Sequence, residues 1–230
     1  MIFTRTLFAG CLLTVAAHAG PITLNNPSFE IAPPLTISCG VGCQYDTPGS
    51  LIPDWTYTVL SNAGGQWQPG SPANPTYFSV PPPDGTTIAY LSSGAVLSQM
   101  TSAAVQLGVT YTLNVDVGVN ASVSPYGAPG GLGEVLLQIV GGPTIAGIGV
   151  APPLGTFSTY TAAYIGVAAD VGKEIEVSLA DPSSGTATFD NVSLSDSAAG
   201  AGAPEPASVA LIGAGLGAIA LYRRSRAKTF

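Results

Sequence analysis

Asp190 occupies a position in the sequence where a carboxylate needs a partner. It lies in the run 189–194 (FDNVSL), in which it alternates in step with Val192 and Leu194. Alternate residues of a strand point to the same face, so this pattern places a carboxylate among apolar side chains. Because an unpaired buried carboxylate is costly, we expect Asp190 to be hydrogen-bonded, bound to a cation or displaced by a β-bulge. Calcium suits such a position, since it takes about six to eight oxygen ligands.

Two cysteines, Cys39 and Cys43, are separated by the tripeptide Gly-Val-Gly. In an exported domain, which the ends of this chain indicate, such a pair forms a disulfide whose glycines permit a tight loop. A two-cysteine metal or redox site is the alternative, but the domain offers no histidine or further cysteine to complete it. We therefore predict a Cys39–Cys43 disulfide.

Several aromatic residues have side chains that could stack against sugar rings. Trp67 and Tyr77 lie in or beside a polar stretch rich in Gly and Pro, where we expect them to be exposed. Tyr90 is the third candidate ligand-binding residue. The alternative for these side chains is packing in the core, which is the prediction for Trp55 at the start of a strand.

The region between residues 20 and 203 is acidic and lacks histidine. It holds 12 of the 13 acidic residues against Lys173 as its one base, and the single histidine, His18, precedes it. We expect no nucleic-acid partner, because phosphate binding takes basic side chains. Catalysis of the Ser-His-Asp or Cys-His type and histidine-bearing zinc sites are excluded. A glycosidase would need two carboxylates about 5–10 Å apart, and no spacing selects such a pair.

The elements that position these residues are strands. The clearest alternation spans residues 111–119, where every odd position is apolar and every even position is polar or glycine. Similar runs are separated by Gly, Pro, Asn and Asp, and they cover residues 55–60, 87–91, 134–140, 156–166, 174–180 and 186–195. We predict one all-β domain over residues 20–196, an antiparallel β-sandwich of the jelly-roll type. The Pro-rich stretch 68–83 is expected to be a surface loop.

The N-terminus has the pattern of a cleavable leader. Arg5 is followed by an apolar run over residues 7–17 and by Ala17-His18-Ala19, a small-x-small pattern. We predict a signal peptide over residues 1–19, cut before Gly20. The alternative, a membrane anchor, would need about 20 apolar residues, and this run is shorter.

The C-terminus combines three segments in a fixed order. Pro204-Glu205-Pro206 precedes an apolar stretch at 207–222, and a basic cluster follows that includes Arg223 and Arg224. We predict a single transmembrane helix whose basic end stays in the cytoplasm, joined to the domain by a flexible linker at residues 197–203. A permanent anchor is the alternative to a removable tail.

These C-terminal residues resemble the PEP-CTERM sorting signal of Gram-negative bacteria that make exopolysaccharide. The likeness covers residues 204–230, including Pro204, Glu205, Pro206, Arg223 and Arg224. It implies recognition by an exosortase, a membrane protease-transpeptidase that removes the tail. The protein would then be exported, held briefly at the membrane by its C-terminal helix, and released to the cell surface or beyond it.

The body of the chain resembles two related groups. Asn25-Asn26-Pro27-Ser28-Phe29-Glu30 and Phe189-Asp190-Asn191-Val192 are similar to the first and last strands of galactose-binding-like jelly rolls and of family 4-type carbohydrate-binding modules. That resemblance implies one structural calcium, with Glu30 and Asp190 as candidate ligands. Further motifs in the same order resemble the HpiC1-type cyclase family, and they include Ile52-Pro-Asp-Trp55, Gly65-Gln-Trp67, Ile88-Ala-Tyr90-Leu91 and Gly155-Thr-Phe157.

Two hypotheses for function follow from these resemblances. The first is a non-enzymatic, calcium-stabilised domain that binds exopolysaccharide or another glycan at the cell surface through Trp67, Tyr77 and Tyr90. The second is a cyclase-like enzyme acting on a hydrophobic small molecule, with Asp190 as general acid in an aromatic pocket. One carboxylate can hardly serve both roles, because a calcium ligand must be ionised. Aromatic rings on an exposed face would favour the first hypothesis, and an enclosed aromatic pocket around an acid the second.

Overall fold

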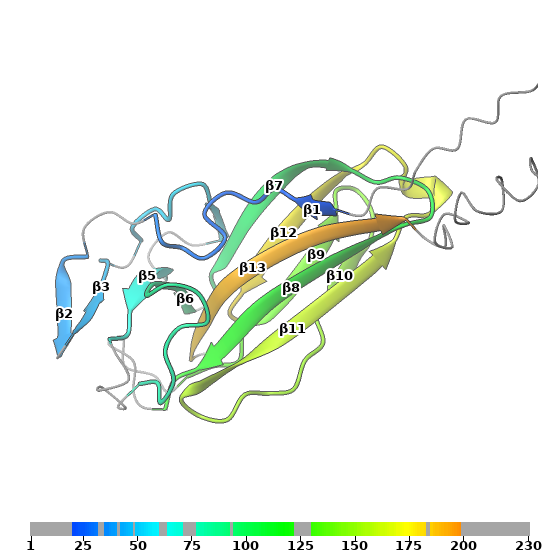
Figure 1. Ribbon diagram of the computed structural model, residues 1–230. Helices are drawn as coiled ribbons and strands as arrows, with labels where there is room; N and C mark the ends of the chain where they lie inside the picture. Colours follow the sequence, from blue (N-terminus) through cyan, green and yellow to red (C-terminus); the bar gives the residue numbers. More distant parts are fainter. Residues whose placement is uncertain are drawn as a thin grey trace, which may run out of the picture. The chain divides into compact units, whose positions relative to one another are not determined.

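The computed structural model describes most of the domain between the two ends of the chain (Figure 1). The described residues are 20–31, 35–40, 42–47, 49–59, 64–70, 77–92, 94–121, 130–182 and 185–198. The predicted signal peptide, the sorting motif at 204–206 with Arg223 and Arg224, and the apolar segment 207–222 lie outside them. Among the described residues, no helix has the length and apolar character that crossing a membrane requires.

Two antiparallel sheets form the fold, as the alternation of apolar residues predicts (Figure 1). The larger sheet has the order β11 (Thr156–Ile165), β8 (Val109–Val119), β13 (Thr186–Ala198), β6 (Ile88–Ser92), β5 (Gly64–Gln68), β3 (Cys43–Tyr45) and β2 (Ile37–Gly40), with β1 (Gly20–Ile22) paired to β13. The smaller sheet has the order β10 (Thr144–Ala146), β9 (Glu134–Ile139), β12 (Glu174–Ala180), β7 (Val96–Ala104) and β4 (Thr56–Val59). A short 3-10 helix, η1 (Ala168–Asp170), precedes β12.

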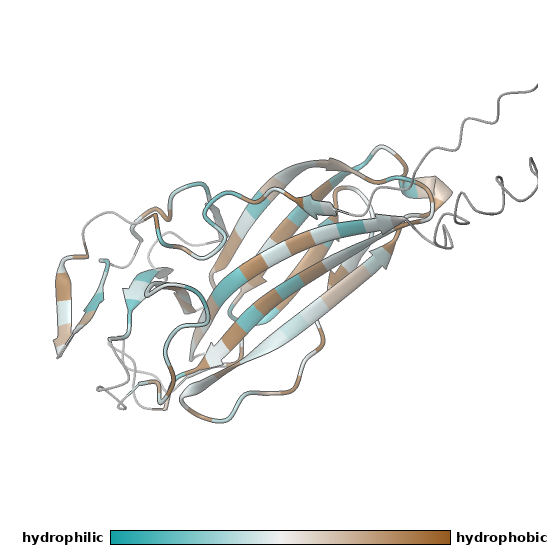
Figure 2. Cartoon of the chain, viewed as in Figure 1, coloured by the Kyte–Doolittle hydropathy of each residue, from teal (hydrophilic) through white to brown (hydrophobic). Residues whose placement is uncertain are grey.

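The main core lies between the two sheets. Along β8 the buried side chains are every second residue, and apolar and polar segments alternate along β8 and β13 in Figure 2. Side chains of β7, β9 and β12 complete this core from the smaller sheet. Trp55 packs on Phe29 with ring centroids 5.4 Å apart, so the prediction that Trp55 belongs to the core is confirmed.

Several strands were not predicted from the sequence. The main omission is β7, whose sequence VLSQMTSAA mixes apolar and small polar residues without a clear period. The others are short, and β5 begins with two glycines. Pairing with neighbouring strands stabilises these segments where local propensity does not. At the C-terminal side β13 continues to Ala198, slightly beyond the predicted domain boundary at residue 196.

The two ends of the sandwich differ in what they carry. At one end, which we call the tail end, β7, β11 and β13 finish and β1, β8 and β12 begin. At the opposite end, the hairpin end, lie the β2–β3 hairpin and β5 (Figure 1). The candidate site residues all belong to the hairpin half of the domain.

Candidate functional site

An interruption in the pairing of β13 brings the first and last motifs of the domain together. β6 pairs with Thr186–Phe189 and β1 pairs with Leu194–Asp196 of the same strand. The pairing of β13 with β8 shifts register between Asp190 and Ser193, which is the bulge that the sequence allowed for. The chain after β1 passes this interruption, where the Val192 amide donates to the Pro27 carbonyl over 3.0 Å.

Asp190 is fully buried at this bulge, and both of its oxygens accept hydrogen bonds from backbone amides. Oδ2 accepts from the amide of Asp84 at 2.9 Å, and Oδ1 accepts from the amide of Asn191 at 2.7 Å. The pKa of Asp190 is raised to about 7, mainly by burial. The carboxylates of Asp84 and Glu30 also raise it, and the hydrogen bonds from the two amides lower it. This carboxyl group therefore lies in an environment that disfavours its charge.

Glu30 lies beside the same loop and organises it. Its Oε1 accepts hydrogen bonds from the amides of Thr86 at 2.7 Å and Thr87 at 2.6 Å. Gly85, between Asp84 and Thr86, has a φ of +67°, and a Cβ there would collide with the Glu30 carboxylate. The loop thus requires glycine for both its conformation and its close approach to Glu30.

Asp84 joins the two predicted residues, and it was missed at the level of sequence. Its carboxylate accepts a hydrogen bond from the Ser28 hydroxyl at 2.6 Å, while its amide bonds to Asp190. We call Glu30, Asp84 and Asp190 the acid cluster. The sequence signal for Asp84 was the Asp-Gly pair after three prolines, which is typical of a tight turn.

The acid cluster has the donor chemistry of a calcium ligand set. Its three carboxylates are oxygen donors without nitrogen or sulfur, which favours calcium over zinc. Lys173 is the one basic side chain of the described residues, and it is ion-paired with Asp170 near the tail end at 2.7 Å. However, the described residues contain no group of three or more His, Cys, Asp or Glu side chains placed to hold a metal ion. Backbone carbonyls would have to supply the remaining ligands.

The predicted ligand-binding aromatics lie together, but they are buried. Trp67 is 1% exposed and Tyr90 is equally enclosed, so the prediction that Trp67 is exposed was wrong. Tyr77 is partly buried and meets Trp67 edge to face, with ring centroids 5.2 Å apart. Phe78 packs on Trp67 from one side and stacks on Phe157 at 4.7 Å. Trp67, Phe78 and Tyr90 belong to a second, smaller core, against which the partly buried rings of Tyr77 and Phe157 pack.

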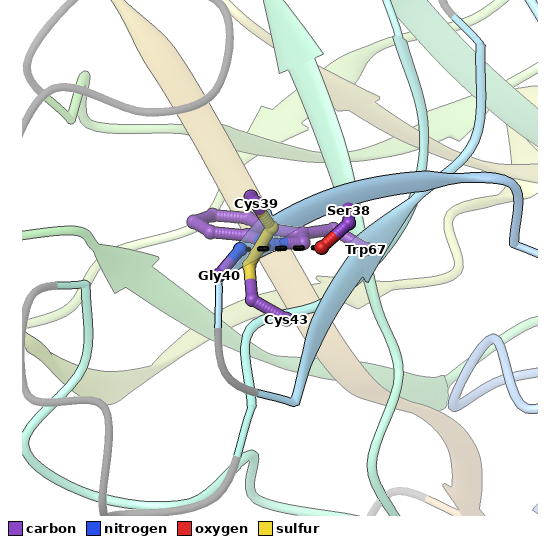
Figure 3. Close-up of a disulfide and its surroundings, with 5 residues drawn as sticks. All are labelled: Ser38, Cys39, Gly40, Cys43 and Trp67. Atoms are coloured by element: carbon purple, nitrogen blue, oxygen red, sulfur yellow. Dashed lines mark hydrogen bonds between the residues drawn. A yellow bond between two sulfur atoms is a disulfide. The ribbon is translucent and has the colours of Figure 1, made fainter.

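The disulfide closes this second core. Cys39 and Cys43 are bonded across the β2–β3 hairpin, with their Cα atoms 5.1 Å apart. The indole Nε1 of Trp67 donates to the sulfur of Cys43 at 3.2 Å, and the ring lies directly behind the sulfur atoms in Figure 3. The hairpin covers Trp67 through tertiary pairing of β3 with β5, which the local sequence around Trp67 does not reveal.

A pocket of about 330 Å³ opens between the hairpin and the loop that Glu30 holds. Gln68 is its main hydrogen-bonding side chain, and its Nε2 donates to the Thr87 hydroxyl at 3.2 Å. The described lining is neutral and consists of Gly42, Gln68, Gly70, Pro81, Pro82, Gly85 and Thr86. Neither Gln68 nor Thr86 was singled out from the sequence, because uncharged residues in a loop carry no chemical signature of their own.

A further buried acid lies behind the aromatic core. The Tyr90 hydroxyl donates to the backbone carbonyl of Asp46 at 3.1 Å. Burial raises the pKa of the Asp46 carboxyl, and a hydrogen bond with the backbone of Gln66 opposes that rise. The buried ring and the hydrogen-bonded hydroxyl of Tyr90 account for it as a packing residue.

Comparisons with known proteins agree with this architecture. Residues 20–195 match the HpiC1 cyclase family, and residues 203–227 match the PEP-CTERM protein-sorting motif. Among solved structures, the Stig cyclase FisC from Fischerella sp. TAU, in complex with (3Z)-3-(1-methyl-2-pyrrolidinylidene)-3H-indole, is 21% identical with a TM-score of 0.65, and the match covers 79% of this chain and 100% of the cyclase. An apo cyclase from Fischerella sp. is 20% identical with a TM-score of 0.64, covering 79% and 98%. A search of curated proteins gave no match.

The protein is of the all-β class, an antiparallel sandwich with an acid cluster and a pocket at its hairpin end. The chain belongs to the HpiC1 cyclase family, whose model spans almost the whole described domain. Its PEP-CTERM motif indicates an exported, exosortase-processed cell-surface protein of a Gram-negative bacterium. The resemblances to the HpiC1-type cyclase family and to the PEP-CTERM sorting signal are thereby confirmed.

Proposed function

We propose that the domain is a calcium-stabilised binding module of a cell-surface protein, and that it takes a short glycan, such as a segment of exopolysaccharide, in the pocket beside the acid cluster. The observation that carries this proposal is the shared loop. Residues 84–87 are held by hydrogen bonds to Asp190 and Glu30, and two residues of this loop, Gly85 and Thr86, line the pocket.

The size and lining of the pocket suit a small neutral ligand with hydroxyl groups. Its volume of about 330 Å³ lies at the small end of ligand pockets, and one or two sugar rings fill such a space. Gln68 and Thr86 offer hydrogen-bond donors and acceptors, and the ring of Pro81 offers an apolar surface. A sugar would therefore bind here through hydrogen bonds and ring contacts without the buried aromatic core.

Calcium would act on the loop and only indirectly on the ligand. Bound between Glu30 and Asp190, it would balance carboxylates that have no basic neighbour and favour the ionised form of Asp190. The ionised carboxylate accepts the Asp84 amide more strongly than the protonated group does. Binding of calcium and of the glycan would then be coupled through residues 84–87.

A glycan array followed by calorimetry tests this proposal on the exported protein. We expect binding to at least one neutral polysaccharide fragment in calcium, and weaker binding in chelator. Gln68→Ala should lower the affinity about threefold to tenfold, as the loss of one hydrogen bond does. Gln138→Ala, on β9 of the other sheet, is the matched control and should bind as the unmodified protein does. Absence of binding to any glycan under both conditions would overturn the proposal.

A cyclase-like enzyme is the second candidate, and two observations favour it. The chain belongs to a family of cyclases, and Asp190 has a pKa of about 7, which suits a general acid near neutral pH. Incubation with isoprenylated indoles and mass spectrometry of the products would test it. Turnover that is lost in Asp190→Asn, in a protein that still folds, would establish this role and displace calcium from Asp190.

A further inference from the structure

The tail end of the sandwich carries a group of exposed apolar side chains. We call Leu107, Val140, Ile165, Val167 and Val171 the tail-end apolar surface, and these residues are between 41% and 68% exposed. Ile165 is the last residue of β11, and the others come from three connections that meet at this end: β7 to β8, β9 to β10, and β11 to β12. Apolar residues gathered at one end of a domain mark a contact surface more than scattered ones do.

Backbone hydrogen bonds hold these connections together. The amide of Gly108 donates to the carbonyl of Gly166, and the amide of Gly172 donates to the carbonyl of Val105, each over 2.8 Å. Lys173 adds a third tie, since its Nζ donates to the Gly141 carbonyl and pairs with Asp170, both over 2.7 Å. The connections that carry the apolar side chains are therefore linked to one another by hydrogen bonds.

The chain enters and leaves the domain at this same end. Gly20 of β1 pairs with Asp196, and Ala198, the last residue of β13, pairs with Val109. In Figure 1 the arrowhead of β13 and the 3-10 helix lie at the same end of the sandwich. Only residues 199–206 separate Ala198 from the apolar segment that begins at residue 207. Fully extended, those residues span at most about 30 Å.

We propose that the tail-end apolar surface inserts into the outer leaflet of the membrane while the sorting tail is still attached. The proposal rests on the predicted membrane insertion of residues 207–222, and it goes beyond ligand binding. A tether this short keeps the tail end near the lipid headgroups, where apolar side chains enter the boundary with the acyl chains. The pocket at the hairpin end then points away from the membrane.

The side chains around this surface are acidic or already paired, which favours insertion of apolar side chains over attraction to lipid charge. Glu174 is exposed and Asp196 is partly exposed, whereas Lys173, the only base of the domain, is engaged by Asp170 and Gly141. Attraction between anionic lipids and basic side chains is thus not available to this domain. We expect the contact to occur on uncharged lipid and to respond little to salt.

Two exposed apolar side chains elsewhere on the domain provide an internal control. Ile148 and Val150, on the connection between β10 and β11, are each 81% exposed and so exceed every residue of the tail-end surface. Ile148 bridges to Thr161 in the middle of β11, away from the point where the chain leaves. If exposure alone governed membrane contact, Ile148 would enter the lipid more readily than Leu107.

Lipid quenching of a fluorophore tests the proposal on the exported protein with its tail uncut. Leu107→Cys and Ile148→Cys are each labelled with a polarity-sensitive dye, because Cys39 and Cys43 are bonded to each other. The proteins are reconstituted in phosphatidylcholine vesicles, and carbonate extraction verifies that the tail is embedded. With spin-labelled lipid, we expect quenching at residue 107 to be at least threefold stronger than at residue 148.

A second variant separates insertion from mere proximity. Val171→Glu, combined with a reporter at Val167→Cys, should reduce lipid quenching at residue 167 to the level at residue 148. Equal quenching at residues 107 and 148 in vesicles with an embedded tail would overturn the proposal. The proposal would also be overturned, in favour of a protein partner, if the dye at residue 107 reported an apolar environment only with added exosortase. The same holds if it did so only at high protein concentration in detergent.

Discussion

Asp190 and Asp170 are both buried aspartates of this domain, yet their carboxyl groups are perturbed in opposite directions. Burial raises the pKa of Asp190 to about 7, and two neighbouring carboxylates add to that effect. Hydrogen bonds from Lys173 and Tyr164 lower the pKa of Asp170 below its ordinary value. Burial alone therefore does not decide the state of a carboxyl group. The partners that the fold places beside it decide that state.

The difference shows how the two halves of the domain are stabilised. At the tail end the chain supplies its own cation, Lys173, which joins the 3-10 helix to the turn at Gly141. Among the described residues of the hairpin half there is no basic side chain, and the carboxylates of Asp190 and Glu30 accept hydrogen bonds from backbone amides instead. The predictions below test this contrast, and they begin with the largest expected effect.

Asp190→Asn should lower the free energy of unfolding by about 3–5 kcal/mol in calcium, because the neutral amide loses the charge-assisted hydrogen bonds and binds calcium more weakly than a carboxylate does. Chemical denaturation with calcium present measures this loss. The control is Asp116→Asn, at the paired position of β8 but partly exposed, where we expect less than about 1 kcal/mol. In chelator the cost of Asp190→Asn should shrink, since the unmodified domain then carries an unbalanced buried acid. An equal cost in both solutions would refute a metal role for Asp190.

Removal of calcium should destabilise the unmodified domain by about 2.7 kcal/mol when free calcium had been a hundredfold above its dissociation constant. A thermal shift assay with and without chelator measures this effect. Magnesium serves as the control ion, because it demands a smaller and more regular oxygen cage. A melting temperature that stays unchanged on chelation would exclude the calcium site.

Loss of the disulfide should cost about 2 kcal/mol, which is the chain-entropy term for a loop this small. The double variant Cys39→Ser/Cys43→Ser tests it by denaturation. Because Trp67 donates to the Cys43 sulfur, reduction should also change its fluorescence, while Trp55 in the main core should report no change. If the variant unfolds together with the main core at an unaltered midpoint, the hairpin contributes nothing to stability.

Asp170→Asn should give the smallest effect, and a pH series reveals its sign. Since the pKa of Asp170 is lowered in the folded state, its contribution is present above the ordinary value and is lost as pH falls through the lowered pKa. The melting temperature of the variant should thus be lower than that of the unmodified protein at pH 7 and equal to it in strong acid. Glu174→Gln, at an exposed neighbouring position, should show no such convergence. A difference that persists unchanged at acid pH would mean that Asp170 acts through packing.

Much of the fold followed from local alternation. The strands around residues 111–119, 156–166, 174–180 and 186–195 were predicted because side-chain direction in a strand has a period of two, which is visible without any tertiary contact. The conflict at Asp190 was visible for the same reason, and it pointed to a bulge that the structure contains. Strands such as β7 and β5 were missed because pairing with neighbours, more than their own residues, makes them strands.

The candidate site was predicted only in part. Glu30 and Asp190 both accept hydrogen bonds from the loop at residues 84–87. Asp84, Thr86 and Gln68 were identified only in the structure. Trp67 was misjudged because its glycine-rich neighbours suggest exposure, whereas a hairpin distant in sequence covers it. Burial is a property of the assembled chain, and local composition does not report it.

By itself, the sequence determined the all-β class, the acidic domain with a single base, and the sorting signal, since each depends on residue type and order along the chain. The tertiary structure alone decided which residues share a site. It closed the aromatic residues into a second core, left a neutral pocket beside the acid cluster, and placed the domain's one lysine near the end opposite that cluster. These outcomes depend on contacts between segments far apart in the chain, and no local pattern encodes such distances.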